Sequence, residues 1–236
     1  MTKLLSTEQM AEFANSGCLF FEGLIDEDIN KEFLNDIGHT DIDDVDNIQQ
    51  YFQNIKSSSS IPRIPAGTAL KDAYPLNSPL EKIFKNEIVS GAINSLVGSK
   101  TVVDHQFLHL TFPSKYYAKA NQRQMSQVNH QDSTIDPRTT FDIQLFYFPT
   151  AVTKEMGGTR YIPGTHLRIV NEMGIAKYQN IKGQKNIVCK AGTIGIFHNG
   201  LWHGAGVNFS DDIRYMLSLI HICRCRRIER CRCRWS

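Results

Sequence analysis

Three side chains in this sequence could together bind a transition metal. His130 and Asp132 are separated by one residue, and His203 follows much later in the chain. Side chains alternate between the two faces of a β-strand, so His130 and Asp132 would project to the same side. A neighbouring strand could then add His203. Two imidazoles and one carboxylate are the ligands of non-haem iron(II) sites, which keep open positions for a co-substrate and oxygen.

A cation that could bind a carboxylate follows the third of these residues. Arg214 is permanently charged, and its planar fork matches the geometry of a carboxylate. Asp132 contributes a single negative charge, so iron(II) in such a site would stay net positive and favour an anionic, chelating 2-oxo acid. A His–x–Asp pair alone is weak evidence, because a chain with eight histidines can contain one by chance. The alternative is a surface strand with a solvated aspartate and a hydrogen-bonded histidine.

Four stretches in a fixed order, which include the residues above, make the interpretation more specific. They are residues 128–132, 157–166, 191–198 and 202–208, the last leading to Arg214 and Tyr215. Together they resemble the phytanoyl-CoA dioxygenase-like family of iron(II)/2-oxoglutarate-dependent oxygenases. Residues 6–13 and 17–21 are similar to the opening helix and strand of that family. The resemblance covers most of residues 5–216.

The resemblance implies a role for each candidate residue. His130, Asp132 and His203 would be the iron ligands and therefore the catalytic centre. Arg214 would pair with the distal carboxylate of 2-oxoglutarate, and Gln131 would help to hold this co-substrate.

Two positions qualify this interpretation. Many family members carry serine or threonine two residues after the distal histidine, where this chain has Ala205. A hydroxyl contact to the co-substrate would therefore be missing, which leaves the identity of the 2-oxo acid open. The acidic ligand Asp132 argues against the related halogenases, which have a small residue in its place.

The implied function is that of an iron(II)- and 2-oxoglutarate-dependent dioxygenase. It would use O2 to hydroxylate a small organic molecule, with succinate and CO2 as co-products. The alternatives are a non-catalytic jelly-roll binding protein, or a cupin-type metalloenzyme without a 2-oxo-acid co-substrate. No residue indicates the primary substrate, because one fold can support many chemistries.

The other histidines have simpler interpretations. His198 is the alternative third ligand, but the resemblance favours His203. His166 is expected to make structural hydrogen bonds beside the site. His105 and His109 are four residues apart on a predicted strand and share a face, so we expect core or rim positions near the pocket.

The pattern of apolar residues predicts helices followed by strands. Helices are expected after residues 6–7, over residues 26–37 and over residues 79–96, while the acidic run 41–47 is expected to be a solvated loop. Residues 113–124 form either a solvated loop or a lid. Strands are expected at residues 101–112, 141–148, 159–162, 192–197 and 213–215.

This order of elements predicts an α+β fold. Its core would be a double-stranded β-helix of the jelly-roll or cupin-like type, with N-terminal and flanking helices. We expect one oxygenase domain over residues 1–216, with helical elements in residues 1–100 and the β-helix core in residues 101–216.

The last segment, residues 217–236, is anomalous because cysteine and arginine alternate along much of it. It has the appearance of a translated sequencing-library adaptor, which predicts that the native sequence ends near Met216. The alternatives are a basic nucleic-acid-binding arm and a four-cysteine zinc cluster. We expect no fixed structure for residues 223–236, whereas residues 217–222 alternate suitably for a strand.

Excluding that segment changes the composition. The chain has 26 Lys and Arg and 24 Asp and Glu; the last 20 residues hold six Arg and one Glu, which leaves 20 basic and 23 acidic residues, a formal charge of −3 in place of +2. The apparent basicity is then no argument for binding nucleic acid. The remaining cysteines, Cys18 and Cys189, fit a reducing compartment.

The sequence therefore predicts a cytoplasmic protein that binds a small-molecule substrate and neither nucleic acid nor membrane. It has no apolar run of 18 residues. It does not indicate the oligomeric state, and C-terminal targeting signals cannot be read if the native C-terminus is missing.

Overall fold

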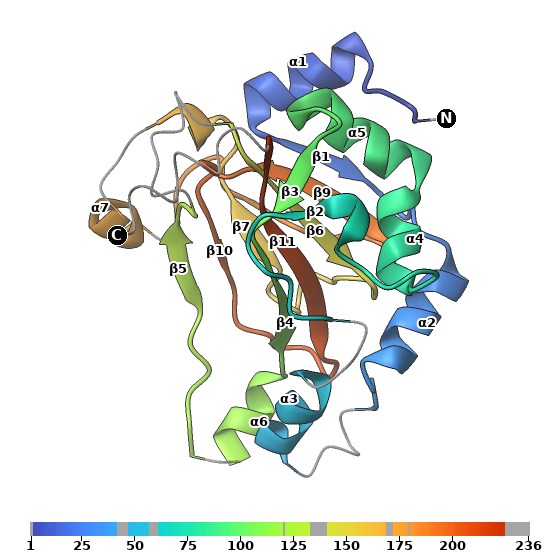
Figure 1. Ribbon diagram of the computed structural model, residues 1–236. Coiled ribbons are helices and arrows are strands. Elements are labelled where there is room, and N and C mark those ends of the chain that lie inside the picture. Colours follow the sequence, from blue (N-terminus) through green and yellow to red (C-terminus); the bar gives the residue numbers. More distant parts are fainter. Residues whose placement is uncertain are drawn as a thin grey trace, which may run out of the picture.

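The computed structural model describes residues 2–41, 47–56, 61–119, 121–132, 141–168, 172–178 and 180–224. Two antiparallel sheets face one another, and helices cover the outer side of the larger sheet (Figure 1). This is the mixed helix-and-sheet architecture that the sequence predicts. Residues 42–46 of the acidic run and residues 225–236 lie outside the described residues, so the expectations for them stay predictions.

The larger sheet is built around β11. Its order is β1-β9-β6-β11-β3-β2, and β4 also pairs with β11. The strands are β1 (Cys18–Phe21), β2 (Thr68–Ala69), β3 (Thr101–Val103), β4 (His105–Thr111), β6 (Ile143–Phe148), β9 (Thr193–His198) and β11 (Arg214–Arg224). Because β11 pairs with β6 on one edge and with β4 and β3 on the other, it is an interior strand.

The smaller sheet has the order β5-β10-β7-β8. These strands are β5 (Gln127–His130), β7 (Thr159–Tyr161), β8 (Lys185–Asn186) and β10 (His203–Ala205). Part of the space between the two sheets is filled by apolar side chains. Phe146 and Phe197 of the larger sheet pack in one cluster with Tyr161 of the smaller sheet. The rest of that space is the cavity described below.

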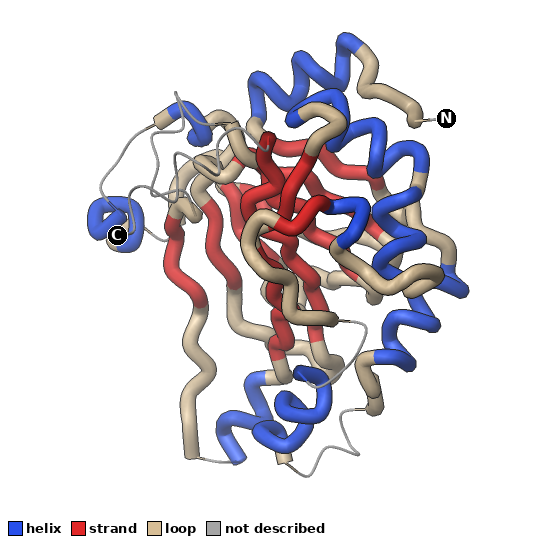
Figure 2. The backbone as a smooth tube through the Cα atoms, viewed as in Figure 1, coloured by secondary structure: helices blue, strands red, loops and turns tan. Residues whose placement is uncertain are grey.

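Most helices lie along one side of the larger sheet (Figure 2). They include α1 (Thr7–Ser16), α2 (Glu27–Asp36), α4 (Pro79–Lys85) and α5 (Glu87–Val97). Farther from this layer are α3 (Ile48–Lys56), α6 (Ser114–Lys119) and α7 (Glu172–Ala176) (Figure 2). The 3-10 turns are η2 (Leu70–Asp72), beside α4 and α5, and η3 (Thr165–Leu167), whose His166 contacts α1. The predicted helix 26–37 is confirmed, with Asp26 and Ile37 as its caps.

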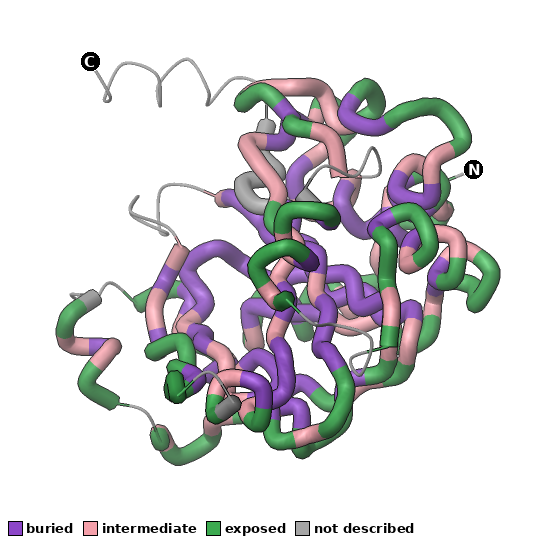
Figure 3. Tube along the Cα trace, turned by 90° about the horizontal axis from the view of Figure 1, so that it is seen from below, coloured by how far each residue is buried: buried purple, intermediate pink, exposed green. Residues whose placement is uncertain are grey.

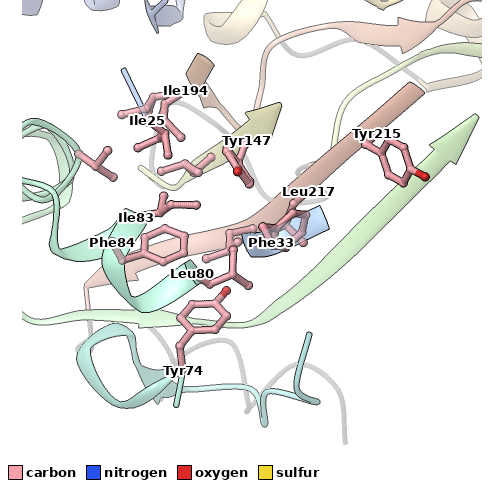
Figure 4. Packing of buried hydrophobic residues seen from close by; sticks show 14 of the residues in the cluster. Ile25, Phe33, Tyr74, Leu80, Ile83, Phe84, Tyr147, Ile194, Tyr215 and Leu217 are labelled. Carbon is pink, nitrogen blue, oxygen red and sulfur yellow. The ribbon is translucent and has the colours of Figure 1, made fainter. Parts of the chain in front are cut away.

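The main core lies between these helices and the larger sheet. Alternate residues of β6 point toward the helices: Tyr147 lies in one cluster with Phe33, Leu80 and Ile83 (Figure 4), and Leu145 belongs to the same cluster. The buried segments accordingly form the centre of the molecule when it is seen from below (Figure 3). The opposite residues of the same strands face the smaller sheet, so alternation along each strand separates the core from the cavity.

Two predicted elements are wrong in their continuity. The expected helix 79–96 is two helices, because Asn86 adopts an extended ψ of 132° and its side chain caps α5 by accepting from the amides of Ile88 and Val89. The expected strand 101–112 is interrupted at Asp104, between β3 and β4. Within the segment 113–124, Ser114–Lys119 is the helix α6.

The strand expected at residues 213–215 is much longer than predicted. Residues 217–222 continue β11, as their alternation predicts, and Leu217 and Leu219 are fully buried. The expectation that residues 223–236 lack fixed structure is wrong for the first two, since Cys223 and Arg224 pair with Val102 and Thr101 of β3. Their backbone groups extend the pairing of β11 with the neighbouring strand β3.

The two cysteines that precede the last segment, Cys18 and Cys189, are both free thiols. None of the helices in the described ranges is long and apolar enough to cross a membrane.

A hydrogen-bonded tyrosine joins the N-terminal region to β11 and yields a test of the fold. The Tyr215 hydroxyl lies 2.6 Å from Tyr51 Oη and 2.6 Å from His39 Nδ1, and the Tyr215 side chain is fully buried. Tyr215→Phe should lower the free energy of unfolding by about 1–3 kcal/mol, because the buried Tyr51 hydroxyl and His39 Nδ1 both lose the Tyr215 hydroxyl as a hydrogen-bond partner. Chemical denaturation measures this value. Tyr178→Phe, at a residue 66% exposed, is the control and should leave stability unchanged; equal stabilities for both variants would contradict the role of Tyr215.

Candidate active site

The two candidate histidine ligands are neighbours across a strand pair. β10 pairs with β5 in antiparallel register, and His203 stands directly opposite His130. Such residues have Cβ atoms about 4.5–5.5 Å apart when they lie on the same face. The two imidazole rings accordingly have their centroids 4.3 Å apart. Strand pairing thus brings together two residues that are far apart in the sequence.

Asp132 completes the group immediately after β5. Its Oδ1 lies 3.2 Å from His130 Nε2, and its Oδ2 lies 3.3 Å from His203 Nε2. One ligand atom from each of the three residues lies within 4.8 Å of the others, and this is the single such group found among the described residues. A cation at about 2.0–2.2 Å from each atom fits this spacing.

The hydrogen bonds behind the imidazoles orient them toward a cation. His130 Nδ1 lies 2.9 Å from the carbonyl oxygen of Val128, and His203 Nδ1 lies 3.0 Å from that of Leu201. A carbonyl can only accept, so each Nδ1 carries a proton and each Nε2 is turned toward the Asp132 carboxylate. The three ligand atoms thus converge on one point, where a metal ion can take the place of the protons between them. This arrangement behind the ligands is typical of metal-binding histidines.

Gln144 is a functional neighbour that our sequence interpretation missed. Its side-chain amide donates a hydrogen bond to Oδ2 of Asp132. Burial by itself raises the pKa of Asp132, but contacts with the two imidazoles and the Gln144 amide outweigh burial and hold the pKa well below its ordinary value. The carboxylate is therefore ionised at neutral pH. The sequence feature that could have indicated it is that Gln144 is a polar residue within the otherwise apolar strand 143–148, whose residues are all buried.

The remaining histidines of this region lie outside the ligand group. His198 is buried, its Nδ1 accepts from the Gly200 amide at 2.9 Å, and burial lowers its pKa to about 4. His166 is also buried, and its Nε2 donates to the Ala14 carbonyl at 3.1 Å. The structure therefore places His203, not His198, beside His130 and Asp132, and gives His166 the structural position expected of it.

The ligand group opens into a cavity of about 810 Å³ between the two sheets. The larger sheet contributes polar and apolar side chains of β4, β6 and β11, and the smaller sheet contributes Thr159, His203 and Ala205. Residues 122–127 pass along one side of the cavity, which also receives Phe52 and Tyr117. Asp132 is the one acidic residue among the described residues that line it.

Arg214 lies in the same cavity and is almost completely buried. Its Nη1 donates to the carbonyls of Met156 and Gly157, and its Nη2 donates to Thr111 Oγ1 at 2.9 Å. Gly157 has a φ of +59°, and a side chain there would overlap the Val207 carbonyl, so glycine is required at this bend.

The guanidinium retains donors for a ligand. Arginine has five N–H groups, and three of them are used in the contacts above. The other two N–H groups, one on Nη2 and one on Nε, have no partner among the described residues. No acidic side chain of those residues forms an ion pair with the guanidinium to balance its charge. Burial lowers the pKa of Arg214 to about 10, so it is a cation at neutral pH. A buried cation in this setting favours an anionic ligand.

Gln131 is the one predicted site residue that the structure directs away from the cavity. Its amide donates to the carbonyls of Arg168 at 2.9 Å and Gly200 at 2.8 Å, and it is absent from the residues that line the cavity. The residue between His130 and Asp132 must point to the opposite face of the chain, which is the physical reason. Gln131 thus fixes the surrounding loops and is not retained as a co-substrate contact.

Solved structures share this fold at low sequence identity. HygX from Streptomyces hygroscopicus, solved with nickel and 2-oxoglutarate, matches with a TM-score of 0.65 and 12% identity over 94% of this chain and 88% of its own. SnoK, a non-heme alpha-ketoglutarate-dependent carbocyclase from nogalamycin biosynthesis, gives 0.62 and 16% over 94% and 87%. EctD from S. alaskensis gives 0.61 and 16% over 93% and 77%.

The sequence comparisons assign the family. A search of curated protein sequences finds no match. A family profile described as Phytanoyl-CoA dioxygenase (PhyH) matches residues 13–216, which is most of the chain and includes all three candidate ligands and Arg214. The chain therefore belongs to the phytanoyl-CoA dioxygenase family.

Proposed function

We propose that this protein is an iron(II)- and 2-oxoglutarate-dependent oxygenase that hydroxylates a small organic molecule. The observation that carries the proposal is the convergence of His130, Asp132 and His203 at the wall of a cavity that also contains Arg214. The family match and the 2-oxoglutarate named with HygX agree with it. We also assign the two facing sheets to the double-stranded β-helix, or jelly-roll, type.

The donor set fits the proposed metal and co-substrate. Two neutral imidazoles and one carboxylate leave iron(II) with a net positive charge and open positions. Arg214 offers two free N–H groups inside the cavity, which suits the distal carboxylate of a 2-oxo dicarboxylic acid. When bound, iron with 2-oxoglutarate supplies oxygen activation coupled to decarboxylation, with succinate and CO2 as co-products.

The protein's own residues hold the metal ligands in place and keep water out of the cavity. The Val128 and Leu201 carbonyls fix the two imidazoles, and Gln144 fixes the carboxylate between them. Phe146 and Met216 line the cavity beside these groups and supply an apolar wall. Polar interactions are stronger behind such a wall because water is kept away from them.

The two alternatives make different demands on Arg214 and on the ligand group. A cupin-type metalloenzyme without a 2-oxo acid does not require a buried cation with free N–H donors in the metal cavity. A non-catalytic binding protein does not require three metal ligands whose side chains are each oriented by a hydrogen bond. Iron-dependent release of succinate from 2-oxoglutarate, stimulated by candidate substrates, tests the proposal. Its absence from iron-loaded protein that binds 2-oxoglutarate would favour the binding protein.

The first prediction concerns the metal ligands. Asp132→Ala should weaken binding of iron(II) or zinc(II) by more than about 100-fold, because loss of a group that only orients a ligand already costs about 10–100-fold. Calorimetric titration under anaerobic conditions measures the affinity. His203→Gln should have a similar effect, whereas His198→Gln should retain the metal. The reverse result for the two histidine variants would show that the third ligand is misassigned.

The second prediction concerns Arg214. Arg214→Lys keeps the charge but loses the planar fork, so the dissociation constant for 2-oxoglutarate should rise by about 10–100-fold. Binding is measured by calorimetry on zinc(II)-loaded protein. The affinity for 2-oxopentanoate, which lacks the distal carboxylate, should not change, and Arg63→Lys serves as a remote control. An Arg214→Ala variant with wild-type affinity for 2-oxoglutarate would rule out this assignment.

A further inference from the structure

A buried histidine in the cavity has no part in the ligand group. His109 lies on β4, and its cross-strand partner on β11 is Met216. The next pair on the same face is Thr111 with Arg214, and the pair on the other side is Phe107 with Ser218. All six of these side chains line the cavity. His109 therefore belongs to the same row of inward-facing residues as Arg214.

His109 is neutral and lies close to the candidate metal ligands. Burial lowers its pKa to about 4, so the ring carries one proton at neutral pH. Ser218, to which the ring is hydrogen-bonded, pairs with Phe146 of β6, and the centroid of the Phe146 ring lies 6.2 Å from that of His203. The row of residues that contains His109 thus extends from Arg214 toward the candidate metal ligands.

The hydrogen bond behind the ring determines which nitrogen carries the proton. His109 Nε2 lies 2.9 Å from Ser218 Oγ, whereas Ser218 Oγ lies 3.5 Å from the carbonyl oxygen of Phe107, at the limit for a hydrogen bond. The hydroxyl can donate to only one of these two acceptors, and the shorter contact favours Nε2, which places the single proton of the ring on Nδ1. Nδ1 has no partner among the described residues. It is an oriented N–H donor in a cavity that must receive an anion.

We propose that His109 is a positioning residue that donates a hydrogen bond from Nδ1 to the metal-binding carboxylate of the 2-oxo acid. The proposal rests on the proposed function, because a 2-oxo acid that reaches from the metal to Arg214 lies along the row that contains His109. The carboxylate and oxo groups of this ligand only accept hydrogen bonds. The opposite wall offers no side-chain donor at Ala205, so a donor from β4 has a clear role.

Two ligands separate this role from that of Arg214. Zinc(II)-loaded protein, which is redox-inert, is titrated calorimetrically with 2-oxoglutarate and with 2-oxopentanoate. His109→Leu should weaken both ligands equally, by about 10-fold or more, since a hydrogen bond to a charged group is lost. His109→Asn, whose side-chain nitrogen can occupy the place of Nδ1, should restore most of the affinity for both. Arg214 variants, in contrast, should affect 2-oxoglutarate alone.

Further variants test the arrangement behind the ring. Ser218→Ala should weaken both ligands by a smaller factor than His109→Leu, because the proton is then no longer held on Nδ1. Imidazole nitrogen NMR of the zinc(II)-loaded protein should show the Nδ1–H tautomer of His109, with an Nδ1 shift when either ligand is added. His105→Leu is the matched control on the same strand, since His105 does not line the cavity, and it should bind both ligands like the wild type.

The outcomes are distinguishable. If the wild type binds 2-oxoglutarate in an Arg214-dependent way but folded His109→Leu, verified by circular dichroism, binds both ligands normally, the role of His109 is wrong and the proposed function stands. Loss of affinity for 2-oxoglutarate alone would place His109 at the distal carboxylate and also overturn the proposal. If the metal-loaded wild type binds neither ligand, the proposed function itself fails.

Discussion

The alternation of side chains along β11 is the constraint on which the rest of the structure depends. Tyr215, Leu217 and Leu219 point to the helices and are fully buried in the main core. Arg214 and Ser218, on the other face, point into the cavity. A shift of one residue in the register of this strand would place a guanidinium in the apolar core and tyrosine in the cavity. The same interior strand therefore stabilises the fold and positions the polar groups of the site.

The geometry of the candidate metal site arises in the smaller sheet from a single cross-strand pair. His130 and His203 stand opposite one another, and Asp132 reaches them from the end of β5. Each imidazole is held by a carbonyl of its own strand or of the turn before it, so orientation requires no distant partner. The larger sheet contributes Gln144, which ties the carboxylate to the opposite wall. The two sheets thus meet at the ligand group.

Charge distribution explains why the cavity suits an anion. Arg214 is buried with its partners limited, among the described residues, to carbonyls and a hydroxyl, which share its protons without neutralising it. A metal ion bound by one carboxylate would add further positive charge. Both cations would then lie in a cavity with apolar walls, where their attraction for a dianion is stronger than in water. His109, the neutral donor that we propose in the same row as Arg214, would add hydrogen bonding without adding charge.

The sequence by itself determined the ligand types and their local spacing. The His–x–Asp pair, the later His203 and Arg214, and the order of motifs around them pointed to one family, and the profile match over residues 13–216 bears this out. Helices before strands were also predictable from periodicity. The interruptions at Asn86 and Asp104 were not, because a side-chain cap or a change of strand partner leaves little trace in an apolar pattern.

Only the tertiary structure decided which polar residues meet. The register of β5 against β10 selected His203 over His198, and the register of β4 against β11 placed His109 and Thr111 beside Arg214. Gln131, which sequence similarity suggested for the co-substrate, turned out to bind loop carbonyls. Pairing between strands depends on contacts far apart in the chain, and local sequence records only which face a residue can occupy, not what lies opposite it.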